Sequence, residues 1–299
     1  MIDIVIVTEK ACLIASKEVA HSAVAIEEDE TLIAAFKKHN ITAKRVAWED
    51  PDFDWSTTKV ALIKSTWNYF HLIPEFRIWL ENVSRNCTLI NSKELVLWNM
   101  DKHYLFELSK YGIQIPETHL LSAEENFDPY LWDKNLGGNG FVVKPTISGG
   151  SKDTYYLKFP YDKRKVTFIQ SDVKRQPMII QPFIQSVVEE GEISLVFING
   201  KFTHARVKKP KSDDFRVQFA HGGTLHEHKA NAKEIDFGKQ VLAVCKKIKS
   251  APLYARIDFC YSESGEILLM ELEVIEPQLW YPESELAVSS LITGVKKLL

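Results

Sequence analysis

Residues 254–277 read YARIDFCYSESGEILLMELEVIEP, and this stretch decides the fold that we expect for the chain. Apolar and polar side chains alternate in both halves, as in two strands with one buried face. The strands Tyr254–Tyr261 and Glu266–Ile275 flank the turn Ser262–Gly265, whose even length puts the polar side chains of both strands on one face. The apolar side chains, Met270 among them, are expected to pack on a core. The polar face carries Arg256, Asp258, Glu271 and Glu273.

This polar face has three carboxylates and one guanidinium, and like charges opposite one another destabilise a sheet. Mg²⁺ prefers carboxylate oxygens and commonly takes phosphate oxygens as further ligands. The alternative is a hairpin edge whose acids face water. The metal is favoured because the acids lie within an apolar strand and a further acid, Glu276, follows them. Buried carboxylates are unfavourable without a counter-charge. We therefore expect Asp258, Glu271 and Glu273 to bind Mg²⁺.

A candidate phosphate site lies earlier in the chain. Lys144 ends the apolar strand 141–144 and precedes the Gly-containing loop 146–151. A lysine in this position can reach phosphate oxygens while the N–H groups of the loop enclose them. Lys102, at the start of the helix 101–111, is a second candidate, and the segment 181–184 (QPFI) has features that an adenine ring could use. Each of these signals alone also fits an ordinary surface lysine or a strand that ends at proline.

The remaining sequence predicts three α+β units. The first ninety residues alternate strands and helices, which is the pattern of a small parallel α/β unit. A second unit combines the helix 101–111 with strands 141–144 and 178–181. The third contains two hairpins with the helix Ala232–Ile248 between them, and the first hairpin turns at Asn199-Gly200.

The composition is that of a globular protein. Of the 299 residues, 45% are hydrophobic and 26% are charged, and the net charge of −3 offers no basic field for nucleic acid. The four cysteines show no metal-type spacing. No signal peptide and no apolar run of membrane-spanning length is recognised, so we expect a cytoplasmic protein without a membrane partner. The oligomeric state stays open, a homodimer included.

Ten short motifs occur in an order that resembles the ATP-grasp superfamily, specifically the glutathione-synthetase-like ligases, a group that includes the D-cycloserine-forming cyclo-ligase acting on O-ureido-serine. The motifs are STWNY (65–69), WNMDK (98–102), VVKP (142–145), QPFI (181–184), GEISL (191–195), KKP (208–210), DFRVQ (214–218), GG (222–223), YARID (254–258) and ELEVIEP (271–277). The resemblance covers most of the chain.

The resemblance implies an ATP-grasp fold of the α+β class. It would comprise a parallel α/β pre-ATP-grasp domain (1–95), a central subdomain (96–184) and a C-terminal subdomain with the metal site (185–299). It also implies two Mg²⁺ ions on the three acids, where Glu273 replaces an Asn common in relatives, and Arg216 and Arg256 as catalytic residues that neutralise transferring charge. Alternation along the first hairpin puts Lys209 on the face of Glu192. The residues implied to bind ATP are Lys102, Lys144, Ser148, Gly149, Gly150, Ser151, Gln181, Phe183, Ile184, Glu192 and Lys209.

The substrate residues are expected at the end of an N-terminal strand, where ligands gather in open α/β sheets. Lys64 and Asn68 replace an Arg and an Asp of relatives, and Trp67 is equally compatible with a core position. The loop 210–223 is interpreted as a lid over the reacting groups, or as an ordinary loop. The candidate substrate residues are Lys64, Trp67, Asn68, Gly222, Gly223 and Glu276.

The implied activity is ligation of a small, amino-acid-like carboxylate to an amine or similar nucleophile. ATP would first convert the carboxylate to an acyl-phosphate, and ADP and phosphate would be released. Two alternatives stay open at this point. One is a small-molecule kinase of the same fold, and the other is a nucleotide-binding regulatory protein without turnover.

Overall fold

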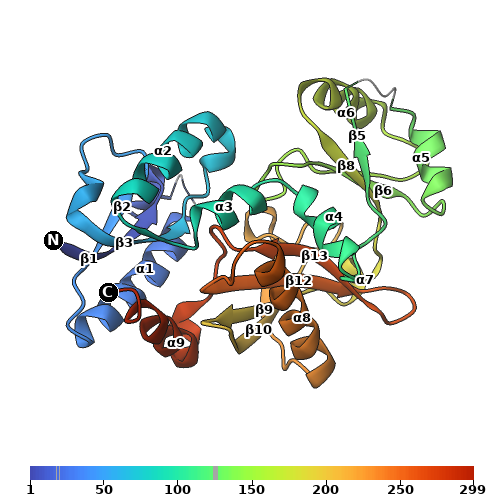
Figure 1. The fold of residues 1–299 in the computed structure, drawn as a ribbon. Coiled ribbons are helices and arrows are strands. Elements are labelled where there is room, and N and C mark those ends of the chain that lie inside the picture. Colours follow the sequence, from blue (N-terminus) through green and yellow to red (C-terminus); the bar gives the residue numbers. More distant parts are fainter. Residues whose placement is uncertain (18, 20, 124–126) are drawn as a thin grey trace.

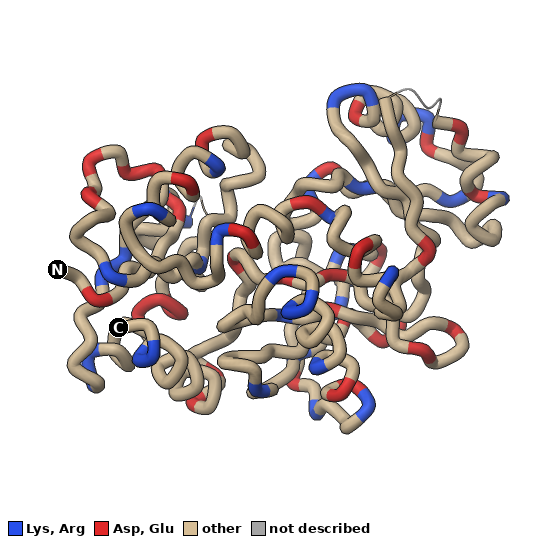
Figure 2. The backbone as a smooth tube through the Cα atoms, in the orientation of Figure 1, with Lys and Arg blue, Asp and Glu red and all other residues tan. Residues whose placement is uncertain are grey.

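The fold is described from a computed structural model that covers residues 1–17, 19, 21–123 and 127–299. Three sheets with their own helices make up the molecule, and the largest sheet lies between the other two (Figure 1). Both termini lie at the end formed by the N-terminal sheet. Lys and Arg are interspersed with Asp and Glu along the whole chain (Figure 2). Among the described residues, no helix has the length and apolar composition that crossing a membrane requires.

The N-terminal sheet is entirely parallel, with strand order β2-β1-β3-β4. Leu32 and Phe36 of α1 pack against one face of the sheet, and Phe76 and Leu80 of α2 against the other. This confirms the predicted parallel α/β unit, although the charged strand β2 was not predicted. The elements are β1 (Ile2–Thr8), α1 (Ser22–Lys38), β2 (Ala43–Ala47), β3 (Thr58–Ser65), α2 (Ile73–Asn86) and β4 (Thr88–Ile90).

The second sheet is antiparallel, with strand order β5-β8-β6-β7, and it follows two short helices, α3 (Lys93–Asn99) and α4 (His103–Lys110). Ile169 and Val173 of α6 pack against Phe141 and Val143 of β6. The elements are β5 (His119–Leu121), α5 (Pro129–Asn135), β6 (Phe141–Pro145), β7 (Tyr155–Leu157), α6 (Lys163–Arg175) and β8 (Met178–Pro182).

The third sheet is also antiparallel, with strand order β11-β10-β9-β12-β13. Helix α8 covers one face, where Val241 and Cys245 contact the same core as Leu195 and Ile257. The elements are α7 (Ser186–Glu189), β9 (Glu192–Ile198), β10 (Lys201–Lys209), β11 (Thr224–Glu227), α8 (Ala232–Ile248), β12 (Tyr254–Tyr261) and β13 (Ile267–Glu273). Both predicted hairpins and the helix between them are confirmed.

The turn of the acidic hairpin differs from the prediction. Tyr261 pairs with Ile267, so the connection has five residues rather than four, and Met270 is a β-bulge between the pairs Phe259–Leu269 and Asp258–Glu271. The odd loop and the extra residue together restore the phase, and the four polar side chains still share one face. Met270 is the exception to the prediction, because the bulge turns it away from the α8 core and toward the polar side.

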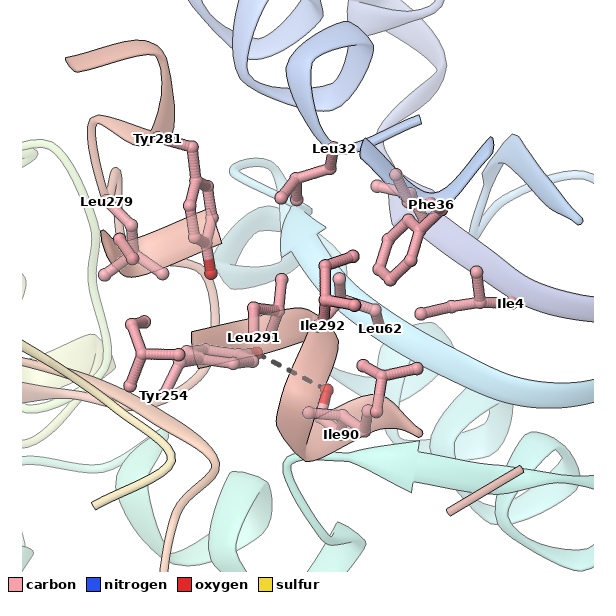
Figure 3. Packing of buried hydrophobic residues seen from close by; sticks show 14 of the residues in the cluster. Ile4, Leu32, Phe36, Leu62, Ile90, Tyr254, Leu279, Tyr281, Leu291 and Ile292 are labelled. Atoms are coloured by element: carbon pink, nitrogen blue, oxygen red, sulfur yellow. Dashed lines mark hydrogen bonds between the residues drawn. The ribbon is translucent and has the colours of Figure 1, made fainter. Parts of the chain in front are cut away.

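The last helix, α9 (Glu285–Val295), packs back onto the N-terminal unit (Figure 3). Its Leu291 and Ile292 share a core with Ile4, Leu62 and the aromatic ring of Tyr254. The hydroxyl of Tyr254 donates to the carbonyls of Ile63 and Ile275 at 2.6 Å each. One core therefore joins the first and the last parts of the chain, and the boundaries at 95/96 and 184/185 stay predictions.

Candidate active site

A cavity of about 620 Å³ lies where the three sheets meet, a size typical of small-molecule sites. Each sheet contributes to it: Trp67 follows β3, Lys144 and Gln181 lie on β6 and β8, and Glu271 lies on β13. Seventeen of the predicted site residues line this cavity, from all three parts of the chain. They are Trp67, Lys102, Lys144, Ser148, Gly149, Gly150, Ser151, Gln181, Phe183, Ile184, Glu192, Arg216, Gly223, Arg256, Glu271, Glu273 and Glu276.

The two phosphate lysines lie beside the predicted loop. Lys102 Nζ is 3.2 Å from Ser148 Oγ and 3.8 Å from a carboxylate oxygen of Glu271. Lys144 is held at the end of β6, and its burial lowers the pKa of its ammonium group. Gly149 is required by space, because a Cβ there would lie 2.5 Å from the ring of Phe70. The loop 146–151 thus packs closely against the N-terminal unit, and Lys102 and Lys144 both line the cavity.

The opposite end of this region offers an apolar, aromatic wall. The ring of Phe183 stacks on Tyr156 with centroids 4.2 Å apart, and Phe215 packs near both rings. Gln181 is buried, and its amide donates to Thr118 Oγ1 at 2.9 Å. The resemblance implies that the backbone of Phe183 and Ile184 holds adenine, but the backbone N–H of Phe183 donates to Gly140 O at 3.0 Å and is not free to do so. Tyr156 and Phe215 were not predicted, because single aromatic residues in loops and short strands look ordinary in sequence.

The acidic face is arranged in two cross-strand pairs. Asp258 lies opposite Glu271, and Arg256 lies opposite Glu273. The guanidinium of Arg256 contacts Asp258 at 2.9 Å, pairs with Glu273 and donates to Gln278 O at 3.2 Å. Its donors are therefore already engaged on this face. Burial, together with the like charges of Asp258 and Glu271, outweighs the opposing charge of Arg256 and raises the pKa of Glu273 to about 7.

Lys208 is a central residue that sequence reasoning missed. Its ammonium contacts Glu192 at 2.6 Å and Asp258 at 2.7 Å. Burial opposes the charge of Lys208, but the two carboxylates outweigh it and raise the pKa of Lys208. Burial opposes the ionisation of Asp258, but the charges of Arg256 and Lys208 outweigh it and hold the pKa of Asp258 below its ordinary value. Burial raises the pKa of Glu192. These residues form one buried chain of alternating charge.

The prediction that Lys209 shares a face with Glu192 is wrong. A register shift between Phe202 and His204 moves β10 by one residue, so Lys208 pairs with Glu192 and Lys209 is exposed. Lys209 does not line the cavity, and neither does Asp258, whose carboxylate is 1% exposed. The alternation rule failed here because it assumes an uninterrupted ladder.

Lys64, Asn68 and Gly222 also lie outside the cavity lining. Lys64 is 2% exposed and pairs with Glu28 at 2.6 Å. Asn68 donates to Glu49 and accepts from Trp48 Nε1. The prediction that Lys64 binds the substrate is therefore wrong, because its ammonium group is buried in the ion pair with Glu28 and does not reach the cavity.

The loop 210–223 lies over the cavity and touches the phosphate loop. His221 Nε2 lies 3.1 Å from Gly150 O. Arg216 lines the cavity and pairs with Asp214 at 2.8 Å, and this pair lowers the pKa of Asp214. Gly223 has no room for a Cβ, which would lie 2.1 Å from Val217 O. These contacts place the loop where a lid would be, and its movement stays a prediction.

The donor set fits a hard divalent cation. The side chains of Glu271 and Glu273 are 38% and 26% exposed, and both line the cavity beside Lys102. Among the described residues, the only three His, Cys, Asp or Glu side chains whose ligand atoms all lie within 4.8 Å are Glu9, Cys12 and His21. The hairpin acids do not enclose an ion by themselves, so phosphate oxygens would have to complete its coordination.

The class of protein follows from comparison of this fold and cavity with known proteins. The chain belongs to the ATP-grasp ligases, because residues 106–267 match the prokaryotic glutathione synthetase ATP-grasp domain. Residues 4–91 match the N-terminal domain of the D-cycloserine synthetase DcsG. The chain is thus related to ATP-dependent enzymes that form C–N bonds, and it is itself such a ligase. Enzymes of this family use ATP, typically with Mg²⁺.

Among its relatives, the cycloserine biosynthesis protein DcsG of Streptomyces lavendulae is 27% identical, with 83% of this chain and 86% of that protein covered. The crystal structure of D-cycloserine synthetase DcsG superposes with a TM-score of 0.81 at 24% identity, covering 99% of both chains. The D-alanine–D-alanine ligase of Bacillus anthracis complexed with ATP gives a TM-score of 0.67 at 18% identity, also over 99% of both chains. The two structural matches show the ATP-grasp fold.

Proposed function

We propose that this ligase activates the carboxylate of a small, amino-acid-like molecule as an acyl-phosphate and passes the acyl group to an amine or a similar nucleophile. The single observation that supports this most is the union, in one cavity, of Lys102 and Lys144 with the carboxylates of Glu271 and Glu273. Such an arrangement suits a triphosphate held by ammonium groups on one side and by metal-bound acids on the other.

In this proposal the cations of the chain position and stabilise the phosphates. Lys102 and Lys144 bind the phosphates nearer the nucleoside, and the N–H groups of the loop 148–151 enclose them. Arg216 neutralises charge on the transferring phosphoryl group from the lid side. Glu271 and Glu273 would hold Mg²⁺, which supplies charge neutralisation between the phosphate oxygens when bound.

The nucleoside would occupy the apolar end of the cavity. Phe183, with Tyr156 and Phe215 packed around it, offers a face for the adenine ring, and Gln181 lies beneath it. Glu192, held by Lys208, is the candidate acceptor for the ribose hydroxyls. The lid would exclude water from the acyl-phosphate, which otherwise hydrolyses.

The printed names of the relatives support small, amino-acid-like substrates. One matched protein is described as acting in cycloserine biosynthesis, and another joins two D-alanines. Both names refer to small molecules that carry amino and carboxyl functions. We therefore take this class as the starting point for a substrate search.

The test is an ADP-release screen with Mg²⁺ over single acids and pairs of acids and amines, combined with the substitution Glu271→Gln. We expect Glu271→Gln to lower turnover at least about 100-fold, since it removes a ligand charge from the transition state. Glu263→Gln, in the exposed turn of the same hairpin, serves as the matched control and should keep full activity. Near-normal turnover by Glu271→Gln, with unchanged unfolding, would refute the assigned role.

A further inference from the structure

The cavity has a second end, away from the adenine wall, where the N-terminal unit meets the segment that follows β13. Trp67 lines this end from the N-terminal side, and Glu276, Gln278 and Trp280 line it from the other. The nucleotide roles proposed above leave these side chains unused. This end is therefore the place left for the acid substrate. The charges of the side chains that line it indicate which charged group that substrate carries.

The backbone around Glu276 is fixed by side chains of the N-terminal unit and the central sheet. Trp67 Nε1 donates to Glu276 O at 2.8 Å, and Tyr254 Oη donates to Ile275 O at 2.6 Å. Lys64 Nζ donates to Pro277 O at 3.3 Å. The carbonyl groups on both sides of Glu276 are thus held in place, so its carboxylate starts from a preorganised position.

The carboxylate of Glu276, by contrast, has no ion-pair partner among the residues that the structure describes. Arg256, which lines the same cavity, is engaged with Asp258, with Glu273 and with Gln278 O. His21, which packs on Trp67 at this end, is engaged with Glu9 Oε1 at 3.0 Å. Among the described residues, the cations around this end are thus paired with other groups, and the carboxylate of Glu276 is left for a cation that a ligand brings.

We infer that Glu276 is the anchor for a positively charged amino group on the acyl-donor substrate, so that the substrate class is an amino acid or a close analogue with a free ammonium. This inference rests on the proposed function and deepens it. The carboxylate of such a substrate would be repelled by Glu276 and would face the lysines and the nucleotide. The ammonium would face Glu276, with the indole of Trp67 as a neighbouring π face. The two opposite charges of the substrate thus determine which of its ends faces the nucleotide.

This arrangement gives Glu276 a specificity role, because it selects an ammonium over a neutral group at the same position. A buried charge pair that loses one partner typically weakens binding strongly, since the other charge is left unpaired. An α-hydroxy acid has the shape of the amino acid but lacks the charge. Glu276→Gln should therefore reduce the preference for the amino acid while leaving the nucleotide end unchanged.

The experiment measures ADP release with matched pairs of acids, in both stereochemical series, with Mg²⁺, ATP and a panel of amines. The pairs are alanine with lactate and serine with glycerate. We expect the amino member of at least one pair to be used at least about 100-fold better than its hydroxy partner by kcat/KM. In Glu276→Gln this ratio should fall to within a few-fold of one, through KM for the acid, while KM for ATP changes less than two-fold. Glu276→Asp should recover part of the preference, and Glu263→Gln should keep all of it.

Equal use of amino and hydroxy acids by the unaltered enzyme, or an unchanged ratio in Glu276→Gln, would overturn the inference and leave the proposed function intact. No ADP release with any acid would overturn the proposed function and the inference together. Calorimetric binding of ADP with Mg²⁺ to both variants shows in either case whether the nucleotide end is intact. A drop in that affinity for Glu276→Gln would assign Glu276 to the metal and also overturn the inference.

Discussion

The buried pair formed by Lys64 and Glu28 makes a strong prediction about stability. Lys64 Nζ lies 2.6 Å from Glu28 Oε2, with the side chains 2% and 5% exposed. The other oxygen of Glu28 accepts the backbone N–H of Leu279 at 2.9 Å and also that of Trp280. Lys64→Met removes the cation and leaves a buried carboxylate, which typically destabilises a protein by about 3–5 kcal/mol. This is a large part of the roughly 5–15 kcal/mol that stabilises a domain.

The assay is urea denaturation followed by circular dichroism, as a double-mutant cycle. In Glu28→Gln/Lys64→Met the amide oxygen of Gln can still accept from Leu279 and Trp280, and no charge is left unpaired. We expect the double variant to lose about 2 kcal/mol less than the sum of the losses in Lys64→Met and Glu28→Gln, a normal coupling for residues in contact. The control is Lys59→Met, in the exposed pair of Lys59 with Asp3, which should cost less than about 1 kcal/mol. Equal losses in Lys64→Met and Lys59→Met, or strictly additive losses in the cycle, would refute the reasoning.

Two further predictions concern charged groups elsewhere. Lys208→Met should weaken binding of ATP with Mg²⁺ at least about 10-fold, because it leaves two buried carboxylates without their shared cation. In Lys209→Met, the control, the affinity should stay within two-fold of the unaltered enzyme. Calorimetry on both variants checks the register of β10, and equal effects on ATP affinity would contradict that register. Burial, the largest influence, raises the pKa of Asp29 from 3.8 to about 7, so the folded chain retains a proton that the unfolded chain releases, and stability falls as pH rises through that interval. Asp29→Asn should therefore stabilise the protein at pH 8, by up to about 4 kcal/mol, and not at pH 4. Urea denaturation measures this, and the same change in the free energy of unfolding at both pH values would contradict the prediction.

The sequence was sufficient for those parts of the fold where local pattern and packing agree. The helix Ala232–Ile248 and the strands Glu192–Ile198 and Tyr254–Tyr261 occur at the predicted residues, since alternation or helical periodicity there coincides with one buried face. Strand β2, with the sequence AKRVA, was missed because two of its five residues are charged. Its pairing with β1 is a tertiary effect that a local pattern does not show.

The candidate site was predictable in its residue types and less so in its geometry. Lys64 and Lys144 look alike in sequence, since each ends an apolar strand. Lys64 is neutralised by Glu28, a partner 36 positions earlier, and only the folded structure brings the two together. Lys208 and Lys209 are adjacent, and a single irregular pairing in β10 decides which of them reaches Glu192. Which lysine reaches the site thus depends on strand register and on partners distant in sequence. The spacing of residues in the sequence does not predict either of these.

The bulge at Met270 has a consequence for comparing this chain with its relatives. Removing that one residue would leave Glu271 next to Leu269 along a regular ladder, with the carboxylate still opposite Asp258. A gap of one position between Tyr261 and Glu271 in an alignment would therefore not signify loss of the acidic face. The same gap placed after Glu271 would turn Glu273 toward the apolar side and separate it from Arg256.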